Sequence, residues 1–193
     1  GASIVVLDIL EDEGKAFEKE MNRKKFNLVF ESFNCSDLNS LNKNFAKIVE
    51  KYKSPDSFIN CSYPHTEDWA KSSFKEITIQ SFRENIDIQM NSYAWLSRLA
   101  AESMIEEGHG GSIIQLGSIY GVVGQDLTVY EGTEIAENMA YSVIKGGITN
   151  LTRLMSSYYG QYNIRVNTIC AGGLNGHMAG ISNRQDQIFI DQY

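Results

Sequence analysis

Residues 112–116 read SIIQL, a short apolar run that ends in Gly117-Ser118, and residues 164–169 read IRVNTI, a second run that ends in a glycine-containing turn. Between them, residues 140–159 carry apolar side chains at helical spacing. Short β-rich runs that alternate with helical segments are typical of parallel strands joined by crossover helices. This stretch therefore predicts the fold class, which is α/β.

The same alternation extends toward the N-terminus. The run at residues 3–7 is almost continuously apolar, as in a strand that is covered on both faces. We therefore expect one doubly wound parallel sheet in a single domain that covers residues 1–193. Strands are expected at 3–7, 26–33, 57–60, 112–116 and 164–169, helices at 11–23, 38–52, 81–105 and 140–159, and loop or weak helix over the last twenty residues.

The sequence contains no G-x-G-x-x-G and no G-x-x-x-x-G-K-[ST] segment. Such a glycine-rich turn normally follows the first strand of a dinucleotide-binding sheet. The chain opens on Gly1-Ala2 directly before a strand, as though a preceding strand, turn and helix were missing. We therefore expect this sequence to be a fragment that lacks the first βα unit.

Composition excludes several classes of protein. The formal charge is −7 and the pI is about 5.0, so the chain lacks the basic surface that a nucleic-acid backbone attracts. Its apolar runs are far shorter than the roughly 20 residues of a membrane span. Cys35, Cys61 and Cys170 show no C-x-x-C spacing, so we expect reduced thiols, no metal site and a cytoplasmic location.

Three side chains have spacing that suits proton transfer. Tyr141 and Lys145 are four residues apart in a predicted helix and project from the same face. An ammonium beside a phenol favours the phenolate, which suits acid–base catalysis near neutral pH. Ser118 follows a parallel-type strand, and ligands bind outside the carboxyl ends of such strands. Taken singly, each residue has a plainer interpretation: an exposed aromatic, a solvated lysine and a serine that caps a loop.

Taken together and in this order, these segments resemble the short-chain dehydrogenase/reductase family. SIIQLGSIYG at 112–121 is similar to the segment that carries the family's catalytic serine, and YSVIK at 141–145 resembles its active-site tyrosine and lysine. IRVNTICAGG at 164–173 is similar to the strand and turn beside the nicotinamide, with Ala171 where proline is usual. Asn60 is the one residue kept from an Asn-Asn-Ala-Gly segment.

The resemblance implies a Rossmann-like fold and hydride exchange with a nicotinamide cofactor. Ser118 would orient the reacting oxygen, Tyr141 would act as acid or base, and Lys145 would hold the nicotinamide ribose. Asp8 ends a strand where a carboxylate accepts hydrogen bonds from a ribose 2′-hydroxyl and repels a 2′-phosphate, so NAD(H) is favoured and NADP(H) remains possible. The residues expected to bind cofactor are Asp8, Ile9, Asp37, Leu38, Asn60, Cys61, Ser62, Tyr141, Lys145, Ala171, Gly172 and Leu174.

Two features depart from the family pattern. Gln89 occupies the position of a fourth catalytic residue, an asparagine, while Asn91 lies two residues further on. Residues 125–138 form an insertion between Ser118 and Tyr141, which we expect to be part of the substrate wall or a solvated acidic loop. Its acidic residues are Asp126, Glu131, Glu134 and Glu137.

A softer resemblance concerns the substrate. SIYGVVGQDLTVYEGT and NCSYP look like bacterial oxidoreductases of surface-polysaccharide and flagellin-glycan biosynthesis, which implies a polar, hydroxyl-rich substrate, a sugar or nucleotide sugar. Hydrogen bonds to it are expected from Tyr63, His65, Tyr130 and Asn138.

The leading hypothesis is an oxidoreductase that interconverts a secondary alcohol and a ketone. Two alternatives stay open: a sugar dehydratase or epimerase of the extended type, and a non-catalytic cofactor-binding protein. The helix at 81–105 is too long and too apolar for a surface helix covered on one side. Together with the helix at 140–159 it predicts a homodimer or homotetramer, as is common in the family.

Overall fold

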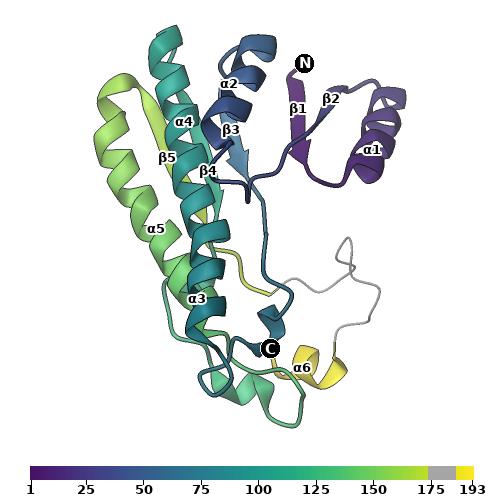
Figure 1. The fold of residues 1–193 in the computed structure, drawn as a ribbon, viewed down its shortest axis with the longest axis vertical. Coiled ribbons are helices and arrows are strands. Elements are labelled where there is room, and N and C mark those ends of the chain that lie inside the picture. Colours follow the sequence, from purple (N-terminus) through teal and green to yellow (C-terminus); the bar gives the residue numbers. More distant parts are fainter. Residues whose placement is uncertain (174–185) are drawn as a thin grey trace.

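The computed structural model describes residues 1–173 and 186–193, which alternate strands and helices along most of the chain (Figure 1). The strands are β1 (Ser3–Asp8), β2 (Asn27–Ser32), β3 (Ser57–Asn60), β4 (Gly111–Leu116) and β5 (Ile164–Ile169). The helices are α1 (Glu11–Arg23), α2 (Leu41–Tyr52), α3 (Ile79–Asn85), α4 (Ser92–Glu107), α5 (Met139–Tyr159) and α6 (Gln187–Gln192). A π-helical segment, Ile86–Asn91, joins α3 to α4.

All strand pairs are parallel, which confirms the predicted α/β class. The described strands form two sheets, one with the order β1-β2 and one with the order β3-β4-β5. In the larger sheet, Ile113 lies beside Phe58 and Val166. Because parallel strands in register end at the same edge, the residues after β3, β4 and β5 gather below the sheet in Figure 1.

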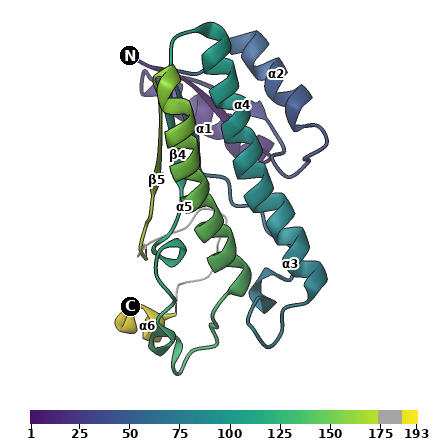
Figure 2. The ribbon, with the colours of Figure 1, turned by 90° about the vertical axis from the view of Figure 1, so that its left-hand side faces the viewer.

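The larger sheet has a continuous core on one face. Helices α2, α4 and α5 lie side by side on that face (Figure 2). Their apolar side chains and those of the sheet form one cluster, with Leu41, Met104, Ala100 and Ile113 fully buried. Burial of a Leu or Met side chain stabilises a fold by about 1.5–3 kcal/mol, so this cluster fixes the frame on which the loops below are mounted.

The smaller sheet is covered differently. Helix α1 packs on β2 at Gly14, where a Cβ atom would lie 2.1 Å from the ring of Phe30. No residue of β1 is fully buried, so the expectation that residues 3–7 are covered on both faces is wrong for this structure. The physical reason is that α1, the helix packed on this sheet, lies mainly against β2 and leaves β1 less covered.

Several predicted boundaries also differ. Residues 38–40 form a turn instead of helix, because the backbone N–H of Ser40 and its hydroxyl both bond to Asp37, which competes with helix formation. The helix expected at 81–105 starts earlier, at Ile79, where the side chain of Thr78 accepts the N–H of Ser81 at 3.1 Å. It is then interrupted by the π-helical segment.

No helix within the described residues is long and apolar enough to cross a membrane.

Candidate active site

Ser118 stands just beyond the carboxyl end of β4. It is 4% exposed, and its Oγ accepts the backbone N–H of Tyr120 at 3.1 Å. That contact starts a 3₁₀ turn, Ile119–Gly121, which leads the chain away from the sheet. The hydroxyl hydrogen of Ser118 has no acceptor within the described part of the chain, so it is available to a ligand oxygen.

Helix α5 brings Tyr141 to the same place. The side chain of Asn138 caps this helix, since its Oδ1 accepts the backbone N–H of Tyr141 at 2.7 Å. Asn138 and Tyr141 are therefore an N-cap and its third helical residue, the usual capping distance. The cap fixes the first turn of α5 and with it the position of the phenol.

Lys145 follows one turn later and points inward. Its Nζ donates to the backbone oxygen of Leu116 at 2.7 Å and lies 5.6 Å from the ring centroid of Tyr141. The residue is 5% exposed, and this burial lowers the pKa of its ammonium to about 8. Burial disfavours the charged form of a lysine, so the proton is held less tightly here than in water.

The loop after Ser118 approaches α5 closely at Gly121. A Cβ atom at this position would lie 2.5 Å from the backbone oxygen of Lys145, which no real side chain tolerates. Glycine is thus required for the loop that carries Ser118 to lie against the turn that carries Lys145.

The side chain of Gln125, the first residue of the 125–138 insertion, bonds to residues at the other end of that insertion. Its Nε2 donates to the backbone oxygen of Asn138 at 3.1 Å and to the hydroxyl of Ser142 at 2.8 Å. Its Oε1 accepts from the N–H of Asn138 at 3.3 Å and from the hydroxyl of Tyr130 at 3.2 Å. One amide therefore joins the first and last residues of the 125–138 segment.

These elements line a cavity of about 300 Å³. Two of its lining residues come from the end of the chain at α6, which contacts the 3₁₀ turn Leu127–Tyr130 and lies at the lower end of the molecule in Figure 1. The size of the cavity is at the lower end of the range for ligand pockets, roughly 300–1,000 Å³. Seven of the thirteen described residues that line it are aromatic, and none is Asp, Glu, Lys or Arg. The lining residues are Tyr63, Trp69, Ser118, Tyr120, Gln125, Tyr130, Ala136, Asn138, Tyr141, Gly172, Gly173, Phe189 and Tyr193.

The structure brings several predicted residues together at this cavity and leaves others outside it. Ser118, Tyr141, Tyr63 and Gly172 line it. Tyr130 and Asn138 line it too, but their polar atoms already bond within the protein, as described above.

His65 is not among the lining residues and stacks behind Trp69. Gln89 lies in the π-helical segment, outside the cavity, with a buried Nε2 that has no partner among the described residues. Its catalytic role stays a prediction.

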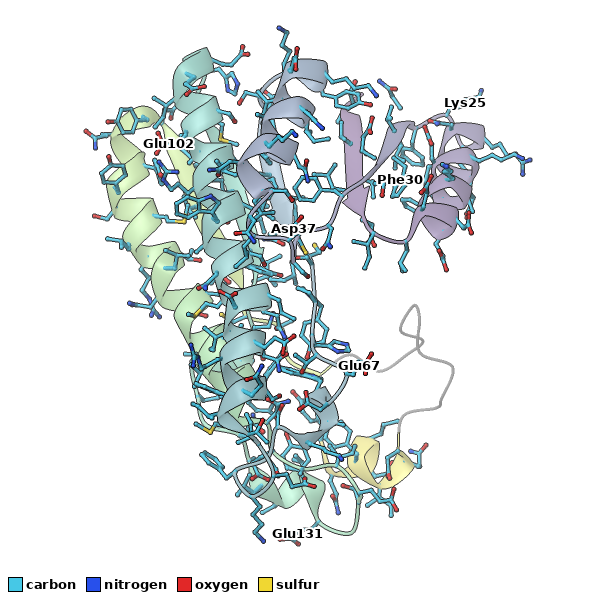
Figure 3. All side chains as sticks on the ribbon, in the orientation of Figure 1. Lys25, Phe30, Asp37, Glu67, Glu102 and Glu131 are labelled. Carbon is cyan, nitrogen blue, oxygen red and sulfur yellow. The ribbon has the colours of Figure 1, made fainter. Side chains whose placement is uncertain are left out.

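The acidic residues of the insertion do not line the cavity. Asp126 accepts the N–H of Thr128 at 3.0 Å, and Glu137 accepts the N–H of Phe74 at 3.1 Å. Glu131 lies at the far lower end of the molecule (Figure 3). The insertion does contribute to the cavity wall, but through its neutral residues.

The residues expected to bind cofactor lie along the carboxyl ends of the strands. Asp8, Ile9 and Asp37 are exposed, and Asp37 lies on the connection from β2 to α2 (Figure 3). The Oδ1 of Asp8 accepts the N–H of Leu10 at 3.1 Å.

Leu38, Ser62 and Ala171 are partly buried, and Cys61 is exposed with a free thiol. Leu174 lies outside the described residues.

The residues missed from sequence include four aromatic lining residues: Trp69, Tyr120, Phe189 and Tyr193. They lie in irregular segments or short helices, where no periodicity identifies a buried face. Composition is the one property of the sequence that could have indicated these residues, since aromatic residues are frequent in the connections after β3 and β4 and at the C-terminus. Their convergence depends on tertiary structure.

Comparison with known proteins shows the family to which this chain is similar. A family model described as short chain dehydrogenase matches residues 1–187. Post-translational flagellin modification protein A from Campylobacter coli is 30% identical over 98% of this chain and 71% of that protein. Trans-4-hydroxycyclohexanecarboxylate dehydrogenase from Sinomonas cyclohexanicum is 28% identical over 97% of this chain and 69% of that protein.

Solved structures show the same fold. A short chain dehydrogenase from Leptospira borgpetersenii with bound NAD+ has a TM-score of 0.74 at 23% identity, covering 99% of this chain and 76% of that one. A gluconate 5-dehydrogenase from Burkholderia cenocepacia, in complex with NADP and tartrate, has a TM-score of 0.74 at 16% identity. The match covers 89% of this chain but only 62% of the gluconate 5-dehydrogenase chain.

Proposed function

Since this chain belongs to the short-chain dehydrogenase family, we propose that its protein interconverts a secondary alcohol and a ketone by hydride transfer with a nicotinamide dinucleotide. One observation carries the proposal. Ser118 and Tyr141 line one cavity, and the buried ammonium of Lys145 lies next to the Tyr141 ring.

The polar groups of the described residues fit such a cofactor. Lys145 has three N–H donors and uses one on Leu116, which leaves two for ribose hydroxyls. The Nδ2 of Asn60, buried at the end of β3, has no partner among the described residues and is a donor facing the strand ends. Asp8 offers an exposed carboxylate. When bound, the nicotinamide ring supplies or accepts the hydride.

The protein's own residues provide the proton chemistry. The hydroxyl of Ser118 donates to the substrate oxygen and orients it. The Tyr141 phenol gives a proton to that oxygen during reduction and takes one from it during oxidation. The Lys145 ammonium, with its remaining donors, holds a ribose beside the Tyr141 ring. General acid–base catalysis of this kind contributes about 10²–10⁴-fold in rate.

We place NAD(H) ahead of NADP(H). The exposed carboxylate of Asp8, at the end of β1, accepts hydrogen bonds from a ribose 2′-hydroxyl and repels a 2′-phosphate.

For the substrate we propose a small ring alcohol or ring ketone of sugar-like size. A cavity of about 300 Å³ suits one ring, and the dehydrogenase from Sinomonas cyclohexanicum is named for a hydroxylated six-membered ring. The flagellin modification relative is the reason to include sugars.

We also propose that the protein is a homodimer or homotetramer that pairs through α4 and α5. The outward side chains of these helices include apolar residues that are 43–65% exposed, namely Trp95, Val143, Leu154 and Tyr158. We expect these side chains to be covered in the assembly, because contiguous exposed apolar surface marks protein–protein contacts. Elution of the full-length protein as a monomer would contradict this assembly.

The central test is the change in nicotinamide absorbance when the full-length protein is incubated with NAD+ and a panel of cyclic secondary alcohols. We expect net formation of NADH that is abolished in Ser118→Ala protein. Cofactor binding without turnover of any alcohol on the panel would overturn the proposal in favour of a non-catalytic protein.

A further inference from the structure

The part of the cavity nearest to Tyr141 is an aromatic surface built on the connection between β3 and α3. The ring of Trp69 packs edge-on against Tyr63, with centroids 5.9 Å apart and an interplanar angle of 88°. Both rings also contact Tyr141, at 6.4 Å for Trp69 and 6.2 Å for Tyr63. We name Trp69 and Tyr63 the aromatic platform.

The platform is held in place from behind and from its backbone. His65 stacks on Trp69 with centroids 6.0 Å apart and an angle of 21°. The backbone oxygen of Trp69 accepts from Asn138 at 3.5 Å, and its N–H donates to Thr66 at 3.1 Å. Trp69 also packs against a buried cluster that includes Ile144, so it lines the cavity with the part of its ring that these neighbours leave uncovered.

A second aromatic group lines the same cavity from other segments. Tyr130 stacks on Phe189 with centroids 5.9 Å apart and an angle of 9°, and Phe189 contacts Tyr193 at 5.5 Å. Aromatic side chains bring large apolar contact areas and prefer defined geometries. The cavity therefore selects ligands mainly by the shape of an apolar surface.

The polar atoms of the cavity also favour a ligand with a largely apolar surface. Gln125, Tyr130 and Asn138 bond to one another, so a ligand hydroxyl that used them would break contacts already made. An unpaired buried polar group costs about 1–3 kcal/mol. We assign the hydroxyls of Ser118 and Tyr141 to the single reacting oxygen, and the other phenols of the described lining belong to Tyr63, Tyr120, Tyr130 and Tyr193.

We propose that the substrate is an uncharged saturated six-membered ring whose C–H face packs on the aromatic platform while its reacting oxygen meets Ser118 and Tyr141. This assignment rests on the proposed function and names the substrate class of that site. Dispersion contacts between the C–H face of a ring and an aromatic face supply the affinity. An open-chain alcohol lacks that face.

Intrinsic fluorescence tests this assignment without turnover. The chain has two tryptophans, Trp69 and Trp95, and the latter lies on α4, where its Nε1 donates to Asn42 at 2.6 Å. In Trp95→Phe full-length protein, Trp69 is the only indole of this chain. Its emission should change saturably with cyclohexane-1,2-diol and not with butane-2,3-diol at the same concentrations.

The matched control is Trp69→Phe protein, which keeps Trp95 and should respond to neither diol. An unchanged emission of Trp69 on addition of the ring diol, or an equal response of the control, would overturn the assignment.

Kinetics give a second measurement. Trp69→Ala should raise KM for the ring diol about 5- to 10-fold, the range of an aromatic contact, and leave KM for the open-chain diol unchanged. An equal rise for both diols would refute ring recognition. If hydride transfer occurs but the emission of Trp69 does not change with the ring diol, the substrate assignment is wrong and the proposed function stands. If the emission of Trp69 changes but no hydride transfer occurs, the proposed function is wrong and ring binding stands.

Discussion

The carboxyl ends of the two sheets differ in how their functional residues are held. Below β4, Ser118 and Lys145 are 4% and 5% exposed; Ser118 accepts the N–H of Tyr120 in its own turn, and Lys145 donates to the backbone oxygen of Leu116. At the end of β1, Asp8 is exposed, and Ile9 beside it is 60% exposed. The larger sheet has a three-helix core behind it, and the smaller sheet has one helix.

Under the proposed function, this difference separates proton transfer from discrimination between cofactors. Proton transfer needs groups fixed to within fractions of an ångström and shielded from water, which only the buried end provides. Discrimination between two dinucleotides needs only a charge near a ribose, which an exposed carboxylate supplies. Substitutions in the first region should therefore abolish the reaction, and substitutions in the second should change its selectivity.

The largest effect is expected at Tyr141. Tyr141→Phe removes the phenolic oxygen and keeps the ring, so kcat should fall by about 10²–10⁴-fold because proton transfer is lost. Binding of NADH, measured by nicotinamide fluorescence, should persist. A variant that retains more than about a tenth of wild-type kcat would contradict the assignment of the buried end as the reaction centre.

A smaller but still large effect is expected at Gly121. Gly121→Ala forces a Cβ atom against the backbone oxygen of Lys145, so thermal unfolding should show a loss of about 1–3 kcal/mol in stability. The matched control is Gly124→Ala, because a Cβ atom there meets nothing within 4 Å. Equal melting temperatures for the two variants would show that the close approach is not needed.

The pH dependence of kcat and of stability should report on Lys145 at the buried end of the larger sheet. Its pKa is lowered to about 8 by burial, so above that pH the ammonium is lost and kcat should fall about tenfold per pH unit. The free energy of unfolding contributed by Lys145 should instead rise with pH. Between about pH 8 and its ordinary pKa of 10.5 the unfolded chain holds the proton that the folded chain has released, so stability rises with pH.

Melting temperatures from pH 7 to 10, compared with those of Lys145→Met protein, measure this contribution. If kcat and the melting temperature fell together through pH 8, unfolding rather than loss of the Lys145 proton would explain the profile.

The smallest effect is expected at Asp8. Asp8→Asn removes the charge and keeps the shape, so the ratio of kcat/KM for NADP+ to that for NAD+ should rise about 3- to 10-fold. Stability should change little, since the side chain is exposed. The result that would undo the comparison is a loss of activity with both cofactors as severe as that of Tyr141→Phe.

Sequence reasoning recovered what depends on local pattern. The bounds of α1, β3 and β5 match the prediction residue by residue, because each segment has a clear period and clear end signals. It also placed Ser118 and Tyr141, which lie at the ends of such segments.

It did not place residues whose role comes from contacts distant in sequence. Trp69 stands in a polar connection, and contacts distant in sequence hold it at the cavity, among them the bond from Asn138, 69 positions away, to its backbone oxygen. Asn138 itself was expected to bind substrate, whereas the structure shows a helix cap. The π-helical segment could not be predicted either, because the apolar spacing of residues 81–105 does not show where the α-helical period is interrupted.

The bonds of Gln125 to Asn138 and Ser142 have a consequence for engineering. With its two ends fastened together by one amide, the stretch between them forms a cassette whose length and composition can be exchanged while the start of α5 keeps its place. New substrate preferences could thus be grafted onto this scaffold one loop at a time, without redesign of the groups that move the proton.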